Sequence, residues 1–388
     1  MKNEGGKLWT KDFVLIILVN FLVFVNHIMV LSTFPFYIES LGGSEAVAGL
    51  AATAFSFIAV ICRPFIGWML DNGKRRAILF IGLCGLALMP IGYLCASILA
   101  LALACRMLHG ASLACSNTTS STIATDIIPR ERFAEGMGMF GMATALATAV
   151  APALGLALME KGYQTLFLTA SAFAVLALVL FLFVKTPQIE TARKPLRFRA
   201  LYSKDALPAS AVMLVFLLTF GALENFLAKF ASENGLPGGG VFFAIMAVML
   251  LLVRVTMGKL ADQKGEGLFV YSCNAAMFTA FLLLAFAPNR GTFLLAAVLA
   301  GYGFGGLEPA LQSMAVHIVT PAERGAANAT FLCAYDIGIG IGGGIAGELI
   351  TSLGYHDMFA LLALSNIVSV LLYVFWGRKH PSSFSHGK

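Results

Sequence analysis

The stretch FVLIILVNFLVFVNHIMVLSTFPFYI, residues 13–38, contains no Asp, Glu, Lys or Arg. A helix that crosses a bilayer needs about 20 mainly apolar residues, so this run is long enough to span a membrane. A signal peptide has an apolar run of only about 7–15 residues and ends at a small-residue cleavage site. This run is longer and no such site follows it, so we expect it to remain as the first membrane span.

Similar apolar runs recur along the whole chain of 388 residues. Hydrophobic residues make up 59% of the chain, charged residues make up 12%, and the mean hydropathy is +0.85. Soluble domains contain about 25% charged residues, so the composition excludes a soluble globular protein. A transmembrane β-barrel is excluded too, because its strands are alternating segments of about 10 residues. We therefore predict an all-α membrane protein. The expected spans are residues 12–37, 45–70, 76–97, 99–125, 133–159, 163–185, 207–231, 238–261, 267–287, 291–318, 325–352 and 357–377.

The basic residues fall mainly on one side of these spans. If both termini are cytoplasmic, 20 of the 26 Lys and Arg residues lie on the cytoplasmic side, three lie within spans and three lie outside. This is the distribution of the positive-inside rule, and it indicates cytoplasmic N and C termini. The net charge of +6 therefore reflects membrane topology and gives no reason to expect a nucleic-acid partner. We expect a protein of the bacterial inner membrane.

The chain repeats itself at an offset of about 190 residues. RPFIGWMLD, residues 63–71, and RVTMGKLAD, residues 254–262, carry Arg, Gly and Asp at the same spacing. IPRERFAEGMG, residues 128–138, and VTPAERGAANA, residues 319–329, share Pro, Glu and Arg at nearly the same offset. Two matched pairs in register indicate a duplicated six-helix unit, a recurring design in transporters. The expected domains are an N-terminal six-helix bundle over residues 1–185, a basic cytoplasmic linker over residues 186–206 and a C-terminal six-helix bundle over residues 207–388.

Several of these segments resemble motifs of the major facilitator superfamily. GWMLDNGKRR, residues 67–76, and GKLADQKGE, residues 258–266, are similar to its loop signature Gly-x-Leu-Ala-Asp-Arg-x-Gly-Arg-Arg/Lys. The first copy departs from that signature at Asn72 and Lys74. RMLHGASLA, residues 106–114, resembles the fourth-span motif. APALG, residues 151–155, resembles the fifth-span antiporter motif Gly-Pro-x-x-Gly, with Ala151 in place of the first Gly.

The resemblance covers essentially the whole chain. It implies twelve transmembrane helices in two pseudo-symmetric six-helix bundles and a secondary transporter similar to drug and metabolite efflux members. We expect such a protein to act as a monomer without a cofactor.

The loop signature implies a contact at the cytoplasmic ends of helices. A Gly lets two helices approach closely, and an Asp four residues later can accept hydrogen bonds from the free N–H groups of a neighbouring helix N-terminus. By resemblance, Asp71 meets the start of span eleven near residues 324–327, and Asp262 meets the start of span five near residues 132–135. Such contacts would form only when the cytoplasmic side is closed; alternatively, the aspartates merely end helices. The candidates for this conformational latch are Gly67, Asp71, Arg75, Gly258, Asp262, Arg132 and Arg324.

Polar residues within the spans are candidates for a substrate cavity, because an ionisable side chain at bilayer depth costs at least ~2.5 kcal/mol. Arg106, His109, Asn117 and Ser120 fall within about 80° of one another on a helix, which predicts a polar stripe that lines an aqueous path. Arg106 is a fixed positive charge that could anchor an anionic group of the substrate. Alternatively, it forms a pair with another residue that only stabilises the fold.

The first span adds two candidates to this cavity, Asn26 and His27. They are adjacent and therefore point about 100° apart, so we expect only one of them to face the cavity fully.

Three acidic residues lie deep in spans of the second half: Glu224, Glu308 and Asp336. Burial disfavours the charged form of a carboxylate, so such a group can bind and release protons as access alternates. These residues are the proton-coupling candidates, although one of them could instead pair with a buried Arg or His.

Other chemistry is not indicated. The seven cysteines show no CxxC spacing, and the sequence has no HExxH, nucleophile elbow or GxxxxGK[ST] loop. We predict no enzyme activity, no metal site and no ATP hydrolysis.

The expected function is secondary active transport of a small molecule by alternating access, most simply proton-coupled efflux. The alternatives are a proton-coupled importer of a small solute, including an anionic one, and a lipid or glycolipid flippase with the same fold. The expected partners are the substrate, protons and the lipid bilayer.

Overall fold

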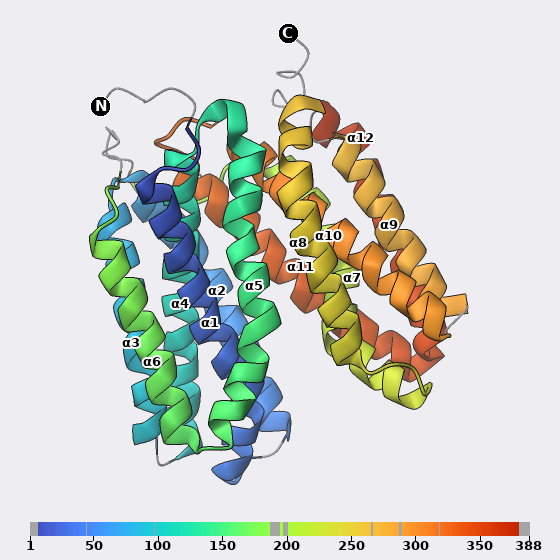
Figure 1. Cartoon of the computed structure of the whole chain (residues 1–388), viewed down its shortest axis with the longest axis horizontal. Coiled ribbons are helices and arrows are strands. Elements are labelled where there is room, and N and C mark those ends of the chain that lie inside the picture. Colours follow the sequence, from blue (N-terminus) through green and yellow to red (C-terminus); the bar gives the residue numbers. More distant parts are fainter. Residues whose placement is uncertain are drawn as a thin grey trace. The chain divides into compact units, whose positions relative to one another are not determined.

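A computed structural model of the chain describes residues 7–43, 45–96, 98–186, 195–196, 201–264, 267–286, 289–317 and 319–379. Within these residues, twelve helices are long and apolar enough to cross a membrane, which confirms the predicted all-α membrane fold (Figure 1). The helices are α1 (Lys11–Ser40), α2 (Glu45–Asp71), α3 (Arg75–Cys95), α4 (Leu99–Ile127), α5 (Phe133–Met159), α6 (Tyr163–Leu182), α7 (Leu207–Glu233), α8 (Gly239–Lys264), α9 (Gly267–Phe286), α10 (Arg290–His317), α11 (Arg324–Leu353) and α12 (Tyr355–Phe375). Short 3-10 turns, η1 (Arg130–Arg132) and η3 (Gly377–Lys379), precede α5 and follow α12.

The helix ends lie within three residues of the predicted span ends. Helix α1 begins after Thr10, whose side chain accepts a hydrogen bond from the Phe13 backbone N–H at 3.2 Å. A threonine at this position satisfies one of the free N–H groups of the first turn. Local signals of this kind, together with the length of each apolar run, explain why sequence reasoning located the helices.

The described helices divide into two compact units that do not follow a single cut in the sequence. Unit 1 comprises residues 1–128, 143–202 and 320–329, and unit 2 comprises residues 129–142, 203–319 and 330–388. Helices α5 and α11 therefore each contribute residues to both units. Of the predicted linker 186–206, residues 187–194 and 197–200 lie outside the described residues.

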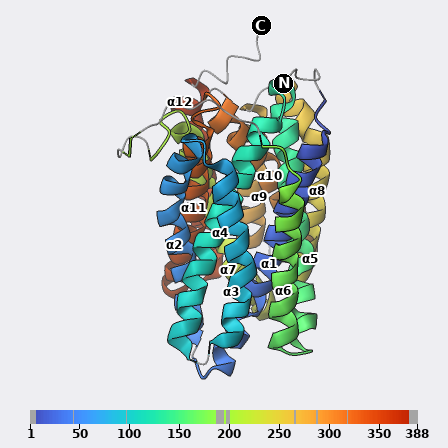
Figure 2. The ribbon, with the colours of Figure 1, turned by 90° about the vertical axis from the view of Figure 1, so that its left-hand side faces the viewer.

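The two units share one packing scheme. In unit 1, α4 packs against α1, α2 and α3, while α6 packs against α1 and α3 (Figures 1 and 2). In unit 2, α10 packs against α7, α8 and α9, while α12 packs against α7 and α9. Each of these five helix pairs of unit 1 thus has a counterpart six helices later. This correspondence confirms the pseudo-symmetric bundles inferred from the repeated motifs.

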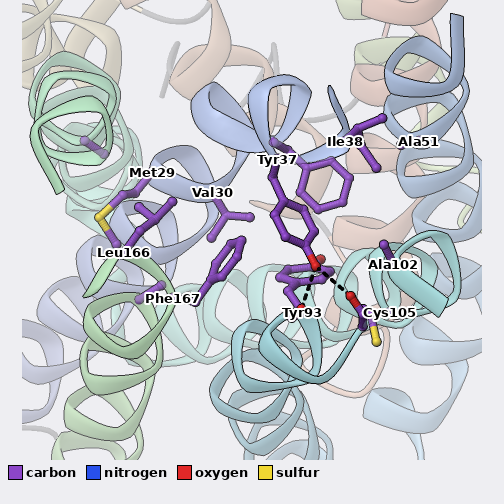
Figure 3. Packing of buried hydrophobic residues seen from close by; sticks show 14 of the residues in the cluster. Met29, Val30, Tyr37, Ile38, Ala51, Tyr93, Ala102, Cys105, Leu166 and Phe167 are labelled. Atoms are coloured by element: carbon purple, nitrogen blue, oxygen red, sulfur yellow. Dashed lines mark hydrogen bonds between the residues drawn. The ribbon is translucent and has the colours of Figure 1, made fainter. Parts of the chain in front are cut away.

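Aromatic side chains fill the core of unit 1 where α1, α3 and α6 meet (Figure 3). The Tyr37 hydroxyl donates to the backbone carbonyl of Tyr93 at 2.5 Å and lies 3.4 Å from that of Ala96, at the end of α3. The Tyr93 ring lies 5.2 Å from the Phe167 ring and 5.1 Å from the Phe34 ring. This packing holds Tyr93 with its hydroxyl directed at α4.

Candidate functional site

The first copy of the loop signature joins the end of α2 to the start of α11 within unit 1. Asp71 Oδ1 accepts the Gly325 backbone N–H at 2.8 Å, and Asp71 Oδ2 accepts that of Ala326 at 3.3 Å. A Cβ atom added to Gly67 would lie 2.8 Å from the Gly325 carbonyl oxygen and 2.7 Å from the Ala329 Cβ. Only glycine therefore permits this approach. The contact lies within residues 324–327, where the resemblance placed it.

A network of buried charges surrounds this contact. Arg75 Nε donates to Asp126 Oδ2 at 2.7 Å, and Arg75 Nη2 donates to the Pro321 carbonyl at 2.6 Å. Arg324 Nη1 donates to Asp126 Oδ1 at 3.1 Å and to the Thr125 carbonyl at 2.6 Å. Asp126 thus bridges Arg75 and Arg324, which the sequence analysis had named as latch candidates without a shared partner. Asp126 itself was missed, because a single Asp at the end of a span resembles an ordinary helix terminus.

The second copy of the signature is only partly described. Helix α8 continues through Gly258 and Asp262, but the side chains of residues 257–264 lie outside the described part of the structure. At the predicted partner segment, Arg132 forms a bidentate pair with Glu135, with two N–O distances of 2.7 Å. The contact between Asp262 and the start of α5 remains a prediction.

Arg106 lies at the centre of a buried polar cluster in unit 1. Its side chain is 1% exposed, and its guanidinium carbon lies 4.4 Å from the Phe55 ring centroid and 4.6 Å from that of Phe34. Such contacts stabilise a desolvated cation by about 2 kcal/mol or more. Among the described residues, Nε and Nη1 of Arg106 have no hydrogen-bond partner. A positive group with free donors inside a protein is a strong attractor for an anionic oxygen.

His109 connects three helices next to Arg106. Its Nδ1 lies 2.9 Å from the Tyr93 hydroxyl, and its Nε2 lies 3.3 Å from Asn26 Oδ1. Asn26 Nδ2 in turn donates to the backbone carbonyls of Ala170 at 2.8 Å and Leu86 at 3.3 Å. The polar cluster is therefore anchored on α1, α3 and α6 as well as on α4.

Asn26 and His27 both lie beside this cluster, in different directions. The His27 ring stacks on Phe55 with 4.9 Å between centroids, and it lies 6.3 Å from the His109 ring. Because the two side chains leave α1 in different directions, Asn26 reaches α3 and α6 while His27 reaches α2. Both side chains nevertheless border the same cluster, because each lies near His109 of α4.

The expected aqueous path is not present at Arg106 and His109. His109 is 0% exposed, and the two aromatic rings beside Arg106 enclose it. Asn117 also lies outside this cluster, because 11 residues of helix separate it from Arg106 by about 16 Å. Farther along α4, Ser120 donates to Asn20 Oδ1 at 3.4 Å. Neither Phe34 nor Phe55 was singled out, because aromatic residues within apolar runs carry no distinguishing sequence pattern.

The polar centre of unit 2 is an ion pair between Arg254 on α8 and Glu308 on α10. The Arg254 side chain is 2% exposed and that of Glu308 is 18% exposed, so Glu308 is the less deeply buried partner. Nε and Nη1 of Arg254 have no hydrogen-bond partner among the described residues. Its guanidinium lies against Gly141 of α5, where an added Cβ would overlap it. The alternative that one of the acidic residues pairs with a buried arginine is confirmed for Glu308.

The other two acidic candidates lie in the same unit. The Glu224 side chain is exposed and forms no hydrogen bond or ion pair within the described residues. Asp336 is half-buried. All three acidic candidates therefore belong to unit 2.

The two units differ chemically at matching positions. At the repeat offset of 191 residues, Arg254 corresponds to Arg63 and Glu308 corresponds to Asn117. Arg63 Nη1 donates to the Thr118 hydroxyl at 3.0 Å, where Arg254 instead faces a carboxylate. The duplicated scaffold thus carries Glu308 in one unit where it carries Asn117 in the other.

Comparisons with known proteins agree with this architecture. The model of the Major Facilitator Superfamily matches residues 16–273 and 240–388. The uncharacterized MFS-type transporter YhhS of Escherichia coli K12 is 26% identical over 375 residues, which cover 94% of this chain and 91% of that protein. YhhS of Salmonella typhimurium LT2 is 28% identical over 381 residues, which cover 95% and 93%.

Two solved structures show the same fold. The human organic anion transporter MFSD10 (TETRAN) superposes with a TM-score of 0.82 at 20% identity, over 93% of this chain and 98% of that chain. The transporter FucP in its outward conformation superposes with a TM-score of 0.79 at 18% identity, over 94% and 98%.

Proposed function

Since the chain belongs to the major facilitator superfamily and is a multi-pass membrane transporter of small molecules, we propose that it exports its substrate in exchange for protons. Both termini lie in the cytoplasm, and the protein acts as a monomer in a bacterial inner membrane. Export follows from the resemblance of residues 151–155 to the antiporter motif, and the location follows from the charge distribution and the bacterial relatives.

The observation that carries proton coupling is the ion pair of Arg254 and Glu308. A carboxylate beside a buried arginine has two distinct states, because protonation of Glu308 removes the ion pair and leaves Arg254 without a counter-charge. Proton binding thereby changes the forces between α8 and α10. Asp336 and Glu224 are further candidates, since they too are acidic residues within helices of unit 2.

Substrate binding is assigned to the cluster of Arg106, His109, Asn26 and His27. Its charge is positive and its walls are aromatic, a combination that suits a small amphipathic compound with an anionic group. For the cluster to bind substrate, the rings beside Arg106 must separate. Asn117 lies farther along α4 and is a separate candidate for substrate contact.

The contacts of Asp71 serve as a conformational latch. They hold the first turn of α11 in unit 1, while residues 330–353 of the same helix belong to unit 2. A movement that carries the first turn of α11 away from α2 would break them. Asp262, Gly258 and Arg132 form the related latch at the start of α5.

A second candidate function is proton-coupled import of an anionic solute. Two observations favour it: Arg106 has free donors, and one of the proteins of the same fold is an organic anion transporter. A lipid flippase shares the fold and predicts that transport depends on a lipid substrate instead.

Proteoliposomes with imposed gradients distinguish these functions. A panel of radiolabelled metabolites and drugs is first screened by ligand-induced thermal shift, and each hit is then tested with inward and outward proton gradients. Export in exchange for protons predicts accumulation of substrate in the compartment that supplies the protons. Accumulation on the opposite side would establish import by symport. Transport that does not depend on the proton gradient would contradict proton coupling.

A further inference from the structure

The guanidinium of Arg254 contacts two other helices of unit 2. Its Nη2 pairs with Glu308 of α10, and its Nη1 lies against Gly141, in the part of α5 that belongs to the same unit. A Cβ atom added to Gly141 would overlap Nη1, and it would lie 2.9 Å from Cζ and 3.4 Å from Nη2. The space that receives this edge of the guanidinium therefore exists only because residue 141 has no side chain.

The backbones of α5 and α8 do not themselves require a glycine at this contact. One turn earlier on α5, a Cβ added to Gly138 would lie 3.5 Å from the Arg254 carbonyl oxygen, which is an ordinary van der Waals distance. At Gly141 the three nearest atoms all belong to the guanidinium. Gly67 differs, because an added Cβ there would meet the backbone of Gly325. Gly141 thus makes room for a side chain, whereas Gly67 lets two helices approach closely.

Few contacts other than this one fix the orientation of the guanidinium. Nε and Nη1 of Arg254 have no hydrogen-bond partner among the described residues, so Nη2 alone holds the guanidinium to Glu308. The backbones of α8 and α10 are in close contact, since a Cβ added to Gly305 would lie 2.9 Å from the Leu250 Cα. This contact sets the place of Glu308 relative to α8. The freedom that remains is rotation of the Arg254 side chain, which the space at Gly141 limits.

The internal repeat does not account for this glycine. At the offset of 192 residues that aligns the segments at 128–138 and 319–329, Gly141 corresponds to Cys333, which has a side chain. Arg254 corresponds to Arg63, whose Nη1 donates to the Thr118 hydroxyl. Glycine therefore accompanies the arginine that has a carboxylate partner, as expected if the glycine serves that ion pair.

We propose that Gly141 is a positioning residue for the ion pair of Arg254 and Glu308, because its missing side chain keeps the guanidinium turned toward the carboxylate. This inference rests on the proposed function, in which the ion pair responds to the proton. A methyl group at residue 141 would displace Nη1 and turn Nη2 away from Glu308, while the helix backbones keep their spacing. The ion pair would then weaken although both charged residues are still present.

A double-mutant cycle on thermal unfolding of the purified full-length protein tests this role. Gly141→Ala should lower the unfolding midpoint by about 2–4 °C when Glu308 is present. In the Glu308→Gln background there is no ion pair to weaken, so the same substitution should shift the midpoint by less than about 1 °C. A glycine that serves only helix packing would give equal losses in both backgrounds.

A second background and a matched control complete the cycle. If Glu308→Gln is too unstable to purify, the double variant Arg254→Gln/Glu308→Gln replaces it, because it removes the guanidinium together with its counter-charge. Gly141→Ala should again leave the midpoint nearly unchanged in that background. Gly138→Ala is the control on the same helix, and its effect on the midpoint should be the same in every background.

The outcomes separate the positioning role from proton coupling. Equal losses from Gly141→Ala with and without the Glu308 carboxylate would overturn the positioning role, and so would an unchanged midpoint when Glu308 is present. The cycle needs neither substrate nor a proton gradient, so its result does not depend on transport. A loss confined to the protein with Glu308, combined with transport that does not depend on the proton gradient, would support the positioning role and overturn proton coupling.

Discussion

Asp71 accepts the backbone N–H of Gly325 at 2.8 Å, although 254 residues separate the two in sequence. The carboxylate occupies the position where the free N–H groups of α11 emerge, and an anion at a helix N-terminus contributes about 0.3–2 kcal/mol. The first turn of α11 is thereby held to the end of α2. Helix α11 continues beyond this first turn into unit 2.

Replacing Asp71 by Asn should weaken this cap while preserving the fold. The amide keeps one acceptor oxygen but loses the charge, so we expect about 1 kcal/mol of lost interaction. Transport should fall severalfold, and the amount of protein in the membrane should stay unchanged. Asp357→Asn, at an exposed position in the first turn of α12, is the matched control. Equal transport by the two variants would exclude the latch.

Gly67→Ala should disrupt the same contact by steric overlap. The new methyl group would lie 2.7 Å from the Ala329 Cβ and 2.8 Å from the Gly325 carbonyl oxygen, so α2 and α11 must separate. Overpacking of this kind costs about 1–3 kcal/mol and should lower the midpoint of thermal unfolding. Gly344→Ala has no atom within 4 Å of the added Cβ and should leave the midpoint unchanged. An unaltered midpoint for Gly67→Ala would show that the helices can shift without loss.

The Arg254–Glu308 pair should respond as a coupled unit. Glu308→Gln leaves a buried guanidinium without its counter-charge, which typically costs about 3–5 kcal/mol. The double variant Arg254→Gln/Glu308→Gln removes both charges and should regain most of that stability. A double-mutant cycle on thermal unfolding measures the coupling free energy. The double variant should nevertheless have lost proton-driven transport, and additive effects would indicate that the pair is not coupled.

Arg106→Lys tests whether a positive charge alone is sufficient for substrate binding in the unit 1 cluster. An ammonium group has no flat face to place between Phe34 and Phe55, so its contacts with the two rings should weaken. We expect at least a tenfold higher KM for an anionic substrate, equivalent to about 1.4 kcal/mol. Arg290→Lys, an exposed arginine at the start of α10, is the control. An unchanged KM would place the substrate away from Arg106.

Much of the fold could be predicted because its determinants are local. Each span is an uninterrupted apolar run of sufficient length, and the predicted ends agree with the helices within three residues. The duplication was visible in two short motif pairs, and the packing of α4 and α10 repeats it in space. The contact of Asp71 was placed correctly, although that inference came from resemblance to a family signature.

The site was harder to predict, because its partners lie far apart in the sequence. Asp126 bridges Arg75 and Arg324 across 51 and 198 residues. Nothing in the sequence distinguished Asp126 from a polar residue at the end of a helix. The predicted angles of Arg106 and Asn117 around α4 place them on one face of the helix. An angle around a helix does not show, however, which side chains lie at the same depth in the membrane.

The amino-acid sequence by itself determined twelve spans, their duplication and a transporter architecture, because the length and charge of a segment control how it enters a membrane. The tertiary structure decided which buried polar groups meet. It placed Arg106 between two phenylalanines, paired Glu308 with Arg254, and joined Asp71 to the start of α11. These contacts depend on side-chain depth and direction across separate helices, and inside a membrane a polar group must find its partner within the protein.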